Sequence, residues 1–196
     1  MIYANCMALS KVRLYLLRFF IAILLFVITG ALSTYFYWSL QETGGVFFPG
    51  LLYTTTTILI FLLTGKKFPI GNFLKYYFSM VLTYLVVWFV TMASSWVVMF
   101  CGPVTAGLGA VATFVLTDMF ITKINYKNSH IFIIGALAFV MTEILYFIFS
   151  GTYDMAPIEY IFKVDIEPVM LFQELFLFWQ VMVGMKLFLT VAKASR

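Results

Sequence analysis

Two carboxylates lie inside long apolar stretches of the sequence, where they could do chemistry. Glu143 is near the middle of "GALAFVMTEILYFIFSG", and Glu174 is in the apolar stretch near the C-terminus. Because an ionised carboxylate is costly in hydrocarbon, such a residue is protonated, shares a proton or binds a cation, and it is a default candidate for function. Alternatively, it is a neutral acid that hydrogen-bonds a neighbouring helix and only holds it in place. Both interpretations stay open.

Two further pairs of polar residues fall in apolar stretches. Asp118 and Lys186 are expected at similar depth, where an ion pair would clamp two helices together; equally, each side chain could reach water at the interface by itself. Gln173 and Gln180 are seven residues apart, which is nearly two helical turns. They therefore share one polar face, which we expect to point into a bundle or towards a partner chain.

Signatures of enzymatic or metal chemistry are weak in this sequence. It has one histidine, and its two cysteines, Cys6 and Cys101, form no CxxC pair. No HExxH motif, GxSxG elbow or glycine-rich phosphate loop is identified. The sequence therefore predicts no metal site and no cofactor, and it does not support an enzyme.

The composition indicates that lipid is the solvent for these residues. The chain has 196 residues, of which 64% are hydrophobic and only 10% are charged, whereas soluble domains carry about 25% charged residues. A soluble core of this size cannot bury so much apolar surface, so a membrane is required. We expect a single polytopic transmembrane domain over residues 1–196.

Six apolar runs predict an all-α membrane protein, with about six transmembrane helices in one compact bundle. Most runs have about 18–25 residues, enough to cross a hydrocarbon core of about 30 Å. Breaks such as "GGVFFPG", "GKKFPIGN" and "CGP" separate them. The second run is the shortest, and merging two runs would reduce the count to four or five. The runs cover about 14–38, 47–64, 73–93, 104–122, 131–150 and 169–192.

The basic residues predict how the bundle is oriented. With six spans, all of the 12 Lys and Arg residues except Lys163 fall on the side of the two termini. The positive-inside rule then places both termini in the cytoplasm, and we expect a bacterial inner membrane. The basic face would contact anionic lipid or dock an acidic cytoplasmic protein.

Small residues recur at helical spacing in the fourth run. Gly102, Ala106 and Ala110 are four residues apart, and Gly109 belongs to a second stripe one turn over. Because small residues let helix backbones approach closely, this run is expected to be the packing centre. The alternative is that the small residues line a cavity.

The stretch "GPVTAGLGAVATFVLTD", in a six-span chain with cytoplasmic termini, resembles one helix of the substrate-binding S components of vitamin uptake systems. This resemblance implies a solute-binding membrane protein. It covers about one helix, and the aspartate of that family falls near Phe114, whereas this chain has Asp118 one turn later. The chain is therefore not assigned to that family.

Two classes of function follow from these residues. The first is a non-enzymatic membrane subunit, namely an anchor, sensor or pore-forming component of a larger bacterial assembly such as a phage-defence or toxin-immunity system. It would form a homo-oligomer, bind a protein partner, or both, without nucleic acid. The second is a small-solute transporter or substrate-binding component in which Glu143 and Glu174 bind a proton or cation. Glycine and proline interruptions lie mainly at span ends rather than at the midplane, which favours the first class.

Overall fold

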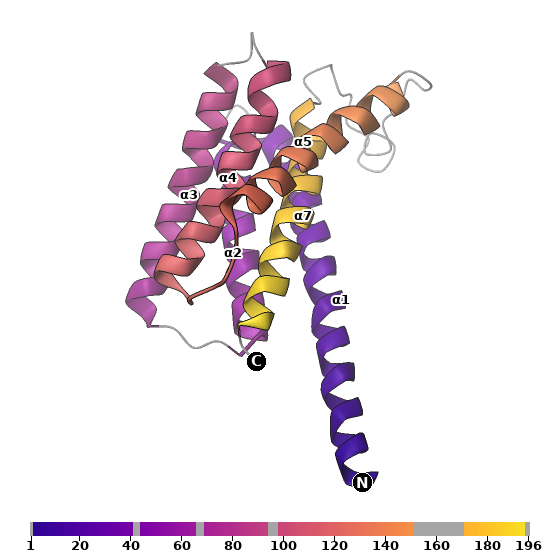
Figure 1. The fold of residues 1–196 in the computed structure, drawn as a ribbon. Coiled ribbons are helices and arrows are strands. Elements are labelled where there is room, and N and C mark those ends of the chain that lie inside the picture. Colours follow the sequence, from indigo (N-terminus) through magenta and orange to yellow (C-terminus); the bar gives the residue numbers. More distant parts are fainter. Residues whose placement is uncertain (1, 41–43, 66–68, 94–97, 151–170, 195–196) are drawn as a thin grey trace.

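The computed structural model describes residues 2–40, 44–65, 69–93, 98–150 and 171–194 (Figure 1). Within these ranges the regular elements are α-helices, and no strand occurs, so the predicted all-α fold is confirmed for the described residues. The helices are α1 (Ile2–Ser39), α2 (Phe47–Leu63), α3 (Ile70–Ala93), α4 (Val98–Phe120), α5 (Asn128–Ser150) and α7 (Leu171–Lys193).

Within the part of the chain that the structure describes, three helices are long and apolar enough to cross a bilayer. The candidate spans are Val12–Tyr37 in α1, Ile70–Val90 in α3 and Gly102–Phe120 in α4. They indicate an integral membrane protein. α2 is a shorter apolar helix of 17 residues, and at 1.5 Å per residue it is about 25 Å long, slightly less than a hydrocarbon core of about 30 Å.

The described helices close into a ring in chain order. Each helix packs against the next, from α1 through α2, α3, α4 and α5 to α7, and α7 returns to pack against α1. α7 also contacts α2 and α4 across the ring, so it lies against four of the other helices. In Figure 1 the N-terminal part of α1 continues beyond the end of the bundle where α7 finishes.

Large side chains fill the half of the bundle where α2 ends and α3 begins. Each described helix contributes a large side chain that is at most 1% exposed. These are Phe26, Phe61, Tyr76, Phe114, Ile131 and Leu187. These side chains belong to one contiguous apolar cluster. By contrast, α3 turns an apolar ridge outward, because four-residue spacing puts its members on one face; the ridge comprises Ile70, Leu74, Phe78, Leu82 and Val86.

The boundaries of α2 follow the predicted breaks, whereas the start of α4 does not. Gly44 (φ 101°) and Gly65 (φ 78°) adopt the left-handed conformation on either side of α2, which glycine tolerates best. The predicted break at "CGP" is wrong, because α4 already begins at Val98 and includes Pro103. Proline removes only one backbone hydrogen bond, and the apolar residues before it let the helix continue.

Candidate functional site: polar links and a cavity inside the bundle

One polar link joins α1 to α2. The hydroxyl oxygens of Thr29 and Thr56 are 2.5 Å apart, and the two side chains are 5% and 6% exposed. Because neither hydroxyl can reach water, each satisfies the other. Thr56 belongs to the run Thr54–Thr57, in which the other three hydroxyls donate to the backbone carbonyl one turn back. Those three hydroxyls are therefore satisfied within their own helix, and Thr56 is the member of the run that links α2 to α1.

A second link joins α1 to α7. The side-chain amide of Gln180 donates to the Ser33 hydroxyl at 3.1 Å, and that hydroxyl donates to the amide oxygen of Gln180 at 3.4 Å. Gln180 is 1% exposed, so this end of the predicted polar face points into the bundle. The side chain of Gln173 lies outside the described residues.

The small residues of α4 pack on α5 through a close helix contact. A Cβ atom added to Gly135 of α5 would lie 2.5 Å from the Ala106 carbonyl oxygen and 2.7 Å from the Cβ of Ala110. At Gly102 an added Cβ would meet the ring of Phe139 at 2.1 Å. Gly102, Ala106 and Ala110 therefore lie on the face of α4 that meets α5, where only small residues leave the backbones enough room.

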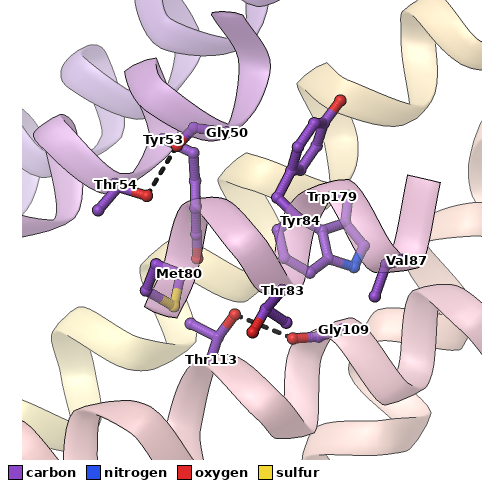
Figure 2. A pocket seen from close by; sticks show the side chains of 10 residues that line it. All are labelled: Gly50, Tyr53, Thr54, Met80, Thr83, Tyr84, Val87, Gly109, Thr113 and Trp179. Carbon is purple, nitrogen blue, oxygen red and sulfur yellow. Dashed lines mark hydrogen bonds between the residues drawn. The ribbon is translucent and has the colours of Figure 1, made fainter. Parts of the chain in front are cut away.

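Gly109 lies on another face of α4, which borders a cavity. An added Cβ there would meet Trp179 at 3.5 Å and Val87 at 3.6 Å, both ordinary contact distances. The cavity measures about 30 Å³ and lies where α2, α3, α4 and α7 meet (Figure 2). It is lined by Gly50, Tyr53, Thr54, Met80, Thr83, Tyr84, Val87, Gly109, Thr113 and Trp179.

Two buried tyrosines differ in their hydrogen bonding. The Tyr76 hydroxyl lies 3.3 Å from the Thr117 hydroxyl and links α3 to α4. The Tyr53 hydroxyl is buried without a hydrogen bond to the described part of the chain. Figure 2 shows it directed towards Met80 and Thr113 at the cavity. Tyr53 is therefore one of the buried polar groups whose bonding the surrounding helices leave incomplete.

Trp179 closes the α7 side of the cavity. Its indole N–H donates to the backbone carbonyl of Ala106 at 3.0 Å, and its ring lies 5.3 Å, centroid to centroid, from that of Tyr53. Neither Tyr53 nor Trp179 was predicted as a site residue. Aromatic residues make up 20% of the sequence, so only the folded structure distinguishes these two.

Asp118 binds Lys123, so the predicted clamp to Lys186 is not formed. The Asp118 carboxylate lies 2.9 Å from the Lys123 ammonium and also accepts the backbone N–H of Ile124 at 2.8 Å. Both partners lie just beyond the end of α4, and a local partner requires less ordering of the chain than one on another helix. Asp118 therefore shapes the turn after α4.

The two carboxylates predicted to lie within the membrane, Glu143 and Glu174, belong to α5 and α7. The structure describes α5 and α7 as neighbouring helices, but the side chains of Glu143 and Glu174 lie outside the described residues. Among the side chains that are described, no three His, Cys, Asp or Glu residues are grouped to hold a metal ion. Comparisons with models of known families, with curated proteins and with solved structures find no match for this chain.

Proposed function

We propose that the protein is a non-enzymatic integral membrane subunit, an anchor, sensor or pore-forming component of a larger bacterial membrane assembly. The observation that carries this proposal is the use of its buried polar groups. The pairs Thr29–Thr56, Ser33–Gln180 and Tyr76–Thr117 each join two helices of the same chain. Polar side chains used in this way fix the arrangement of helices in lipid, which suits a scaffold that holds partners.

An exposed apolar face of the bundle favours a partner that binds within the membrane. α3 packs only on α2 and α4 among the described helices, and its apolar ridge from Ile70 to Val86 is exposed. In a membrane such a face meets lipid tails or the apolar face of another helix. A second copy of the chain, or another membrane protein, would bind here without burying a charge.

The positions of the basic residues favour a cytoplasmic face on which both termini lie. Lys75, Lys123, Lys127 and Lys193 are exposed, and they lie near the start of α3, around the turn from α4 to α5 and at the end of α7. These segments lie at one end of the bundle in Figure 1. We propose six spans with this end in the cytoplasm, where lysines favour anionic headgroups or an acidic protein.

Photo-crosslinking tests the subunit proposal. A photoreactive residue replaces Leu82 on the α3 ridge, and a matched one replaces Ile58, which is on α2 and only 5% exposed. We expect a discrete crosslinked protein from position 82 in native membranes and none from position 58. Native mass spectrometry of the complex then identifies a second copy or another subunit. Crosslinks to lipid alone, together with a monomer in mild detergent, would contradict the proposal.

A transporter or solute-binding protein is the second candidate. It is favoured by the direct packing of α5 on α7, which makes neighbours of the helices that carry Glu143 and Glu174. We predict that Glu143→Gln folds normally and abolishes proton- or cation-linked uptake in proteoliposomes, because the amide cannot ionise. If the residue is structural, Glu143→Gln retains function and Glu143→Leu destabilises the protein.

A further inference from the structure

The cavity between α2, α3, α4 and α7 is small, and its lining includes tyrosine and threonine residues. It measures about 30 Å³, and a water molecule requires roughly 10–15 Å³ on such a measure. The space therefore suits one or two waters and excludes a drug-sized solute. None of the ten lining residues is charged, so a neutral occupant fits better than an ion, whose desolvation would be uncompensated.

The Tyr53 hydroxyl points to water as that occupant. Tyr53 is 3% exposed, and its hydroxyl makes no hydrogen bond within the described residues. The hydroxyls of Thr57 and Thr113 are its neighbours, but neither is placed to accept its proton with hydrogen-bond geometry. The Tyr53 proton is thus left without an acceptor of good geometry, a situation that proteins usually resolve with buried water.

We propose that this cavity is a hydration site that holds one or two ordered water molecules. The water accepts a hydrogen bond from the Tyr53 hydroxyl and donates one to the Thr113 hydroxyl oxygen, which keeps an unused lone pair. In this way it joins α2 to α4, two helices that do not pack directly against each other in the described structure. Thr83 supplies a further hydroxyl to the lining.

Hydroxyl-radical labelling by X-ray pulses tests this site, because radicals formed from bound water modify adjacent side chains whether or not they are exposed. The full chain is irradiated in lipid nanodiscs, and modification of each residue is measured by mass spectrometry. Tyr76 is the internal control, since it is the same residue type, is 0% exposed and has Thr117 as its hydroxyl partner. We expect Tyr53 to be modified several-fold faster than Tyr76.

Gly109→Ala tests whether the labelling comes from this cavity. The added methyl makes only ordinary contacts and occupies space that a water would fill, so the Tyr53 rate should fall to that of Tyr76. Thr113→Val, which removes the acceptor while keeping the shape, should lower the Tyr53 rate as well. Equal rates for Tyr53 and Tyr76 in the original protein would overturn the proposal. A Tyr53 rate that is unchanged by both variants would overturn it too, because the radicals would then come from elsewhere.

Discussion

Two faces of α4 use small residues for opposite purposes. On the α5 side, Gly135 lies so close to Ala106 and Ala110 that an added Cβ would be 2.5 Å from a backbone oxygen. On the α3 and α7 side, an added Cβ at Gly109 would meet nothing closer than 3.5 Å, and a cavity remains. A small residue in a membrane helix therefore marks either a close crossing or a space, and its spacing does not say which.

The partner residues explain this difference. Opposite Ala106 and Ala110 stands another small residue, so two backbones meet directly. Opposite Gly109 stand Val87 and the indole of Trp179, whose bulk keeps the helices apart while leaving part of the gap unfilled. Where two backbones touch, no side chain can rotate away to make room for an added atom. A gap between side chains, by contrast, can accept a water molecule or a methyl group.

The largest effect is expected where the two backbones meet. Gly135→Val should reduce the free energy of unfolding by about 3 kcal/mol or more, at or above the usual cost of overpacking, because α4 and α5 must separate. Gly71→Val is the matched control, since nothing lies within 4 Å of an added Cβ there. Thermal unfolding in detergent, followed by size-exclusion profiles, measures both variants. Similar losses for the two variants would show that the α4–α5 crossing is not close.

Much of this framework could be predicted from the sequence. Apolar runs long enough for the bilayer predicted an all-α fold. The stripe Gly102, Ala106 and Ala110 predicted that the fourth run, now α4, packs closely on other helices. The opposite face could not be assigned in advance, because its cavity depends on Tyr53, Val87 and Trp179 arriving from three other helices. Of the two alternatives left open for Asp118, the clamp to Lys186 is not the one found, for a related reason. Depth along a helix was estimated from the sequence, but rotation about its axis and the local turn at Lys123 were not.

Removing one tyrosine hydroxyl at a time tests the side of α4 that faces α3 and α7. Tyr76→Phe should cost about 0.5–1.5 kcal/mol, because it breaks the link to Thr117. Tyr53→Phe should cost less than Tyr76→Phe, since its hydroxyl has no hydrogen bond within the described chain and gives up only its bond to the proposed water. The two variants delete the same atom from similarly buried rings, so thermal unfolding compares them directly. A larger loss for Tyr53→Phe would mean that its hydroxyl has a strong partner.

Filling the cavity should have a small stabilising effect. In Gly109→Ala the methyl group fits without displacing Trp179 or Val87, and alanine favours a helix over glycine by up to about 1 kcal/mol. Displacement of the proposed water offsets part of this gain, so the melting temperature should stay constant or rise only slightly. The same change at Gly135 places its Cβ 2.5 Å from the backbone oxygen of Ala106 and should lower the melting temperature. If both variants changed stability in the same direction, the contrast between the two faces of α4 would be lost.

The smallest effect is expected at the end of α4, away from both faces. The Lys123 side chain is 87% exposed, and an exposed ion pair contributes about 0–1 kcal/mol, so Lys123→Ala should leave the melting temperature almost unchanged. Asp118→Ala should lower stability more. In the original protein the carboxylate also accepts the Ile124 N–H, and in the variant this N–H loses its partner at the turn. Raising the salt concentration should weaken the original protein slightly and leave Lys123→Ala unaffected, since only the ion pair is screened. A large loss in Lys123→Ala would show that the turn after α4, rather than its packed face, holds the helix in place.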